Sequence, residues 1–168
     1  MTLYQGEGEQ WLSDGVAMYS LAGLPELRLS GLFRIFDISE DKAAEYMQRE
    51  EPALPEDICM EEYAEGDERL ELQDFVFERM GYTFCVLATE DGKALLVQER
   101  YFKPFEDAEA LEYTLRKTPG GKSYITAHDG MFTVAVLLPF DDAGGGIAAY
   151  IRALGAKLIA GTGGEKDG

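Results

Sequence analysis

The clearest hydrophobic pattern consists of two pairs of apolar, β-rich runs, each pair joined by a short polar turn. Residues 82–102 read YTFCVLATEDGKALLVQERYF, with the turn EDGK between the two runs. Residues 123–140 repeat this arrangement around an Asp-Gly turn at 129–130. Asp-Gly between such runs is a strong signal for a β-hairpin, because both residues tolerate the positive φ that the tight turn requires. The pattern therefore predicts two hairpins.

Four further segments carry helical signals. Ala43 and Met47 are spaced to face inward from a helix that follows Asp37 and Glu40, which match a D-x-x-E capping pattern. Residues 106–117 have acids at the start and bases at the end, which suits the helix dipole. The predicted helical segments are a turn at 30–36 and helices at 40–50, 106–117 and 147–160.

Alternation of apolar and polar residues adds strands at 15–21 and 69–79, the second with a register change near Asp74 that is typical of a β-bulge. Together the elements predict an α+β fold with a mainly antiparallel sheet built from two β-hairpins and about three helices. A chain of 168 residues suits one domain. We expect this domain to occupy residues 1–160, followed by a flexible tail at 161–168.

The charge distribution changes this ordinary picture. The net charge is −17, and the segment 37–79 alone holds 16 acids and 4 bases. Such a balance argues against direct binding to DNA or to an anionic membrane, since both require cationic surface. Clustering in one quarter of the chain favours an interaction surface over a coat that only keeps the protein in solution. We therefore expect a basic protein surface as the partner.

The most acidic stretch, EDICMEEYAEGDERLELQD at 56–74, is predicted to be a long acidic loop or insertion near 50–68 that leads into a strand. Carboxylates on alternate strand residues lie ~6.6 Å apart, close to the spacing of phosphates along one nucleic-acid strand. Leu54, Ile58, Met60 and Tyr63 are interleaved with the acids as apolar anchors. The predicted partner-binding residues are Glu50, Glu51, Glu56, Asp57, Glu61, Glu62, Glu65, Asp67, Glu68, Glu71 and Asp74.

A Cys–His enzyme is one alternative. His128 is the only histidine, and Cys59 or Cys85 would supply the thiolate that such a site needs beside a base. Asp129 follows His128 directly, but neighbouring strand residues point to opposite faces, so it is badly placed to orient the ring. A hydrolase that uses paired carboxylates stays open as well, because an acidic sequence always offers pairs.

Metal and nucleotide sites have weaker signals. A segment starting at Asp37 does not match an EF-hand loop, because Lys42 occupies position 6, where the loop has Gly, and Gln48 occupies position 12, where it has Glu. The glycine-rich segment at 144–149 fits G-x-G-x-x-A, but the acid that should follow on a second strand is missing, and Asp141 and Asp142 would repel phosphate. We therefore expect no metal and no cofactor.

The sequence also bears on location. The first ten residues, MTLYQGEGEQ, lack the basic and apolar regions of a signal peptide. The longest apolar run, MFTVAVLLPF, is too short to span a bilayer. Two cysteines without a CxxC motif do not suggest a disulfide framework. We expect a cytoplasmic protein with reduced thiols and no membrane partner.

The stretches WLSDGVAMYSLAGLPEL, LFRIFDISEDK and RYFKPFED resemble small uncharacterised proteins of phages and other mobile elements of gut Firmicutes, over roughly residues 11–140. That group has no catalytic motif to carry over, so the resemblance supplies only context. Mobile elements encode acidic inhibitors of host defences, among them anti-CRISPR proteins that imitate DNA and block target-DNA binding by Cas9, which holds nucleic acid in positive channels. The resemblance thus implies a non-enzymatic inhibitor of a nucleic-acid-binding effector such as Cas9 with its guide RNA.

Two other functions stay open: the small hydrolase described above, and an accessory or scaffold domain of a mobile element whose charge is only solubilising. Binding and solvation differ in one expectation. If the charge binds a partner, reversing Glu61, Glu62, Asp67 and Glu68 should abolish that binding.

Overall fold

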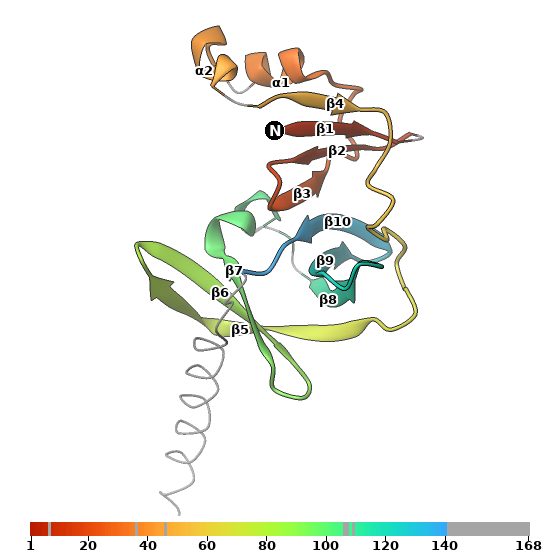
Figure 1. The fold of residues 1–168 in the computed structure, drawn as a ribbon, viewed down its shortest axis with the longest axis vertical. Coiled ribbons are helices and arrows are strands. Elements are labelled where there is room, and N and C mark those ends of the chain that lie inside the picture. The colour runs from red at the N-terminus through yellow and green to blue at the C-terminus, as the bar shows by residue number, and fades with distance from the viewer. Residues whose placement is uncertain (7, 36, 46, 106–107, 109, 141–168) are drawn as a thin grey trace, which may run out of the picture.

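The computed structural model describes residues 1–140 except residues 7, 36, 46, 106, 107 and 109. The predicted helix at 147–160, the predicted tail at 161–168 and the glycine-rich segment at 144–149 therefore lie outside the described residues. The described chain is a mixed α/β structure dominated by one large sheet (Figure 1).

The sheet has ten strands in the order β4-β1-β2-β3-β10-β9-β8-β5-β6-β7. All neighbouring strands run antiparallel except β1 and β4, which are parallel. The strands are β1 (Thr2–Gln5), β2 (Gln10–Ser13), β3 (Ala17–Ser20), β4 (Arg49–Glu51), β5 (Glu68–Arg79), β6 (Tyr82–Thr89), β7 (Ala94–Gln98), β8 (Leu111–Lys117), β9 (Ser123–Asp129) and β10 (Phe132–Leu137).

The predicted hairpin pairings are present as β6–β7 and β9–β10. A third hairpin, β5–β6, turns through Met80 and Gly81, both of which have a positive φ, as a tight hairpin turn requires. The predicted bulge is confirmed as a register shift in β5 between Leu72 and Val76. The prediction of a sheet built from two hairpins nevertheless underestimated the number of strands, because all of these hairpins belong to one continuous ten-stranded sheet.

The short strands β1, β2 and β4 were not predicted. They are only three or four residues long, and unlike β3 none of them lies within a longer run of alternating residues such as 15–21. The predicted strand at 15–21 is confirmed as β3, between β2 and β10.

The predicted helix at 106–117 was wrong over its second half, which is strand β8 between β9 and β5. Tyr113 and Leu115 point into the core, while Glu112, just before them, faces outward. This is a period of two residues, and burial on a pleated surface outweighed the end charges that had suggested a helix. Residues 106, 107 and 109 are not described.

The predicted helix at 40–50 is much shorter. Helix α2 spans Glu40–Ala44, and its N-cap is Ser39 rather than Asp37, with the Ser39 hydroxyl accepting from the Lys42 amide at 3.4 Å. Residues 49–51 leave the helix to pair with β1. Ala43 is buried as expected, but Met47 is 72% exposed, because it follows the end of the helix.

Short helical elements complete the described chain: α1 (Leu29–Ile35), α2, and the 3₁₀ turns η1 (Glu99–Tyr101) and η2 (Lys103–Phe105). In Figure 1 the two α-helices lie beside the edge strand β4. Leu32 and Phe33 of α1 and Ala43 of α2 pack around Leu3 of β1. The predicted helical turn at 30–36 is thus confirmed as α1.

The central strands β8, β9 and β10 have apolar side chains on both faces. Ile125 and Ala127 of β9 point into one core, together with Tyr101 and Phe102 from the segment after β7. The alternate residue Tyr124 points into a second core on the other face, with Trp11, Met18 and Val136. A sheet buried on both faces needs a covering segment on each, and residues 54–60 cover the second face.

Candidate functional site

The segment that connects β4 to β5, with the adjoining parts of both strands, holds all eleven predicted carboxylates. We call residues 50–74 the acidic strip; they contain one base, Arg69. In Figure 1 the chain descends from β4, passes the ends of β10 and β9 and enters β5. β4 and β5 are seven strand steps apart in the sheet, so the acidic strip spans up to roughly 34 Å at ~4.8 Å per step.

Arg116 of β8 fastens the acidic strip to the sheet. Its side chain is only 3% exposed, and all five of its N–H donors are used. Nε and Nη2 donate to the two carboxylate oxygens of Asp67 at 2.8 and 2.7 Å. Nη1 donates to the carbonyls of Cys59 and Glu61 at 3.0 and 2.8 Å, and Nη2 also donates to the carbonyl of Glu62 at 3.0 Å. One buried guanidinium thus fixes four residues of the strip.

Asp67 has a structural role that its place in an acidic run did not suggest. Besides Arg116, it accepts a hydrogen bond from the Ala64 amide at 2.8 Å, which closes the turn before β5. Burial opposes its ionisation, but the bonds from Arg116 and Ala64 outweigh burial and hold the pKa of Asp67 below its ordinary value. The charge of Asp67 is therefore neutralised by Arg116, and Asp67 does not count among the carboxylates that can contact a partner.

Two side chains of the sheet hold the strip further upstream. The Tyr124 hydroxyl accepts from the Cys59 amide at 3.0 Å, and the Thr133 hydroxyl donates to the Met60 carbonyl at 3.0 Å. The backbone N–H of Cys59 and the carbonyl of Met60 are therefore hydrogen-bonded to the sheet, which holds this part of the strip against it.

The apolar residues of the strip have two different fates. Leu54, Ile58 and Met60 pack against the core around Trp11, so they attach the strip to its own sheet. Of these four residues only Tyr63, which is 74% exposed, offers an apolar surface to a partner. The expectation of four outward anchors was therefore wrong for three of them.

The carboxylates of the acidic strip are not equally available. Glu50, on the edge strand β4, accepts from the Leu29 amide at the start of α1 at 2.9 Å. The exposed members are Glu50, Glu56, Asp57, Glu61, Glu65, Glu71 and Asp74, and the half-buried members are Glu51, Glu62, Asp67 and Glu68. Glu56, Asp57, Glu61 and Glu65 are all on the segment between β4 and β5, whereas Glu50 and Asp74 lie on strands near opposite ends of the sheet.

His128 is buried beneath the strip, and both of its ring nitrogens face threonine hydroxyls. Thr133 donates its proton to Met60, so it accepts from Nδ1–H of His128 at 3.2 Å. In the neutral ring Nε2 is then the acceptor for the Thr126 hydroxyl at 2.8 Å, a shorter contact than the 3.4 Å between that hydroxyl and the Thr114 carbonyl. Burial lowers the pKa of His128, and the charge of Arg116 lowers it further against the opposing effect of nearby carboxylates. His128 thus supports the strip as a neutral group.

This arrangement predicts a pH dependence of stability. The unfolded chain takes up a proton at His128 below about pH 6.5, whereas the folded chain resists it. We expect the free energy of unfolding to be at its full value above about pH 6.5 and to fall as the pH is lowered from there toward the depressed folded pKa. Urea unfolding between about pH 7.5 and about pH 5.5 measures this loss, and His128→Gln should reduce it. An equal loss in both proteins would contradict the assignment.

The cysteines do not combine with His128. Within the described chain His128 makes no hydrogen bond to Cys59 or Cys85, and both thiols are free. Cys85 packs against the core on the opposite face from His128. Burial, and next the nearby Glu99, raise the pKa of the Cys85 thiol, which disfavours the thiolate that a nucleophile needs.

No family model, curated protein or solved structure matches this chain. Within the described ranges, no helix is long and apolar enough to cross a membrane. The same residues contain no group of three or more His, Cys, Asp or Glu side chains arranged to hold a metal ion.

Sequence reasoning missed Arg116, Tyr124 and Thr133, which position the strip. From the sequence, Arg116 lies near the end of the predicted helix at 106–117, where a positive charge suits the helix dipole. The signal that could have found it is the alternation in LEYTLRK at 111–117, which puts Arg116 on the face opposite the apolar Leu115. A cation facing inward on a strand needs an anion, and the neighbouring acidic run supplies one.

Proposed function

We propose that this chain is an acidic, non-enzymatic binding protein whose acidic strip occupies a basic, nucleic-acid-binding surface of a partner protein. The observation that carries the proposal is the anchoring of the strip by Arg116, because it presents exposed carboxylates from a backbone that is already ordered. Ordered charges lose less conformational entropy on binding than charges on a free loop.

The dimensions of the strip suit such a surface. Its span of up to roughly 34 Å is similar to one turn of B-DNA, ~34 Å along the axis. Clustering of Glu56, Asp57, Glu61 and Glu65 on one connecting segment gives a dense negative field. Complementary fields of this kind steer association and select basic partners.

In its most specific form, the partner is a Cas9-type effector with its guide RNA, and the chain is an anti-CRISPR protein that acts as a DNA mimic. Support comes from the resemblance of residues 11–140 to mobile-element proteins and from the positive nucleic-acid channels of such effectors. The proposal includes no cofactor, no contact with DNA itself, no membrane partner and a cytoplasmic location.

The two alternatives have less support. A Cys–His hydrolase lacks a pairing between its candidate groups, since His128 is bonded to two threonines. An accessory or scaffold domain with solubilising charge does not require the strip to be fixed to the sheet, although it is compatible with that arrangement.

The proposal is tested by binding of the purified chain to an immobilised Cas9–guide complex at about 50 mM and about 300 mM salt. We expect binding at the lower concentration and a steep loss at the higher one, because exposed charges are screened within about a Debye length. A folded chain that does not bind at about 50 mM salt removes the Cas9 form of the proposal.

A further inference from the structure

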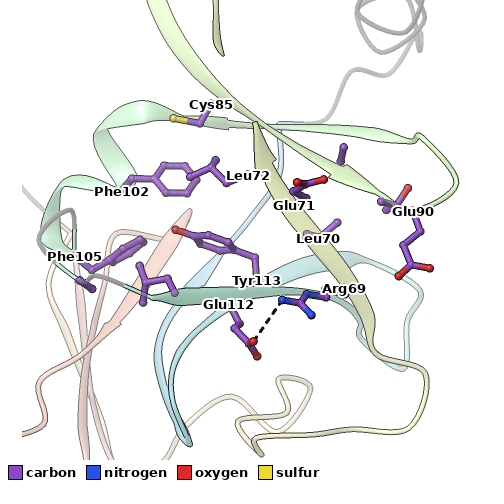
Figure 2. A pocket seen from close by; sticks show the side chains of 14 residues that line it. Arg69, Leu70, Glu71, Leu72, Cys85, Glu90, Phe102, Phe105, Glu112 and Tyr113 are labelled. Atoms are coloured by element: carbon purple, nitrogen blue, oxygen red, sulfur yellow. Dashed lines mark hydrogen bonds and ion pairs between the residues drawn. The ribbon is translucent and has the colours of Figure 1, made fainter. Parts of the chain in front are cut away.

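A cleft of about 770 Å³ opens where β5 separates from β8. The two strands pair only through Glu68–Leu70 of β5, after which β5 continues with β6 alone. The space left between them is bounded by residues of β5, β6 and β8 and by the segment around η1 and η2 (Figure 2). Pockets of 300–1,000 Å³ are of the size that holds small organic ligands.

One end of the cleft is aromatic. Phe102 lies edge-on to Phe105 and to Tyr113, with ring centroids 5.8 and 5.9 Å apart. Leu72 and Cys85 complete this end in Figure 2. Such a lining favours a flat apolar body, because aromatic rings stack or meet edge-on with one another.

The Tyr113 hydroxyl is an unused donor at this end. Tyr113 is only 7% exposed, and its hydroxyl makes no hydrogen bond with another described residue. Burial, and next the nearby Cys85, raise the pKa of Tyr113 to about 12, so the phenol keeps its proton at neutral pH. The hydroxyl itself opens onto the cleft, so a ligand that offers an acceptor there would be favoured.

The other end of the cleft is anionic. Figure 2 shows Glu71, Glu90, Arg69 and Glu112 on the side away from Phe102 and Phe105. Arg69 pairs with Glu112 at 3.5 Å, which leaves Glu71 and Glu90 without a cation among the described residues. Two carboxylates next to an apolar space favour an ammonium group on the ligand.

We propose that this cleft binds a small organic cation with an aromatic body, a hydrogen-bond acceptor at one end and an amine at the other. The aromatic end takes the body, the Tyr113 hydroxyl donates to the acceptor, and Glu71 with Glu90 receives the amine. The proposal goes beyond the binding of a basic protein by the acidic strip. The cleft shares Glu71 with the strip, but binding of the small cation does not require binding of the protein partner.

Three probes separate the features of the ligand. Tyramine carries all of them, phenethylamine lacks the oxygen, and 3-(4-hydroxyphenyl)propionate replaces the amine with an anion. In titrations followed by NMR at low salt, we expect saturable 1:1 binding of tyramine, with amide shifts at Leu72, Cys85 and Tyr113. Phenethylamine should bind about fivefold more weakly, the effect of one hydrogen bond, and the anion at least about tenfold more weakly.

Variants assign each difference to a residue. Tyr113→Phe should give tyramine and phenethylamine the same Kd. Glu71→Gln should reduce the ratio of the Kd of 3-(4-hydroxyphenyl)propionate to the Kd of tyramine. Glu61→Gln, which removes an exposed carboxylate outside the cleft, should change neither ratio. The proposal is overturned by equal binding of the anion, by absence of saturation, or by shifts that map away from the cleft in the wild-type chain. This last readout holds even where a variant fails to fold.

Discussion

Replacing Arg116 with methionine is expected to lower the free energy of unfolding by about 3 kcal/mol, within the range for removing one partner of a buried ion pair. The change leaves Asp67 without its cation and the carbonyls of Cys59, Glu61 and Glu62 without a donor. For a chain of this size the melting temperature should fall by about 6–12 °C. Thermal and urea unfolding measure both quantities.

The matched control is Arg69→Met, because Arg69 also pairs with a carboxylate but is 74% exposed. Exposed ion pairs contribute little, so this variant should stay within about 0.5 kcal/mol of the wild type. Hydrogen exchange gives a second readout. The amides of residues 59–67 should exchange faster in Arg116→Met than in the wild type, and at the wild-type rate in Arg69→Met. Equal protection of these amides in all three proteins would show that Arg116 does not hold the strip.

The second large effect concerns the exposed carboxylates. Replacing Glu56, Asp57, Glu61 and Glu65 with their amides is expected to weaken binding to a basic partner roughly 100-fold at low salt, since each exposed charge pair contributes up to about 1 kcal/mol. The dependence of affinity on salt should flatten as well. Surface-based binding assays across a salt series measure both.

This set differs from the reversal of Glu61, Glu62, Asp67 and Glu68 that the sequence alone suggests. Asp67 is bonded to Arg116, so changing it would disturb the fold and the binding surface together. The matched control neutralises four exposed acids outside the strip, Glu26, Asp41, Glu45 and Glu78. Equal losses in the two variants would mean that only net charge matters, and that the strip is not a specific surface.

The hairpins and the bulge of β5 were predictable because their signals are local. Asp-Gly turns and a shift in alternation involve residues that are neighbours in the sequence. The strand β8 was mistaken for a helix because LEYTLRK contains helix formers beside a period of two, and only pairing with β9 and β5 decides between them.

For the site, the sequence located the acidic strip but not the way it is held. The interaction of Arg116 with Asp67 joins residues 49 positions apart, and that of Tyr124 with Cys59 joins residues 65 positions apart. Contacts between such distant residues follow from the sheet topology, which the pattern does not reveal. The same limit explains why the sequence suggests Ile58 and Met60 as anchors for a partner, although they pack against the core.

The most direct test of the proposed mimicry is a competition titration on the Cas9–guide complex with a target DNA duplex. If the acidic strip occupies the nucleic-acid channel, the chain and the duplex should exclude each other. The apparent Kd for DNA should then rise in proportion to the concentration of the chain, and the variant at Glu56, Asp57, Glu61 and Glu65 should lose this effect. A ternary complex in which DNA affinity is unchanged at saturating chain would contradict the proposal.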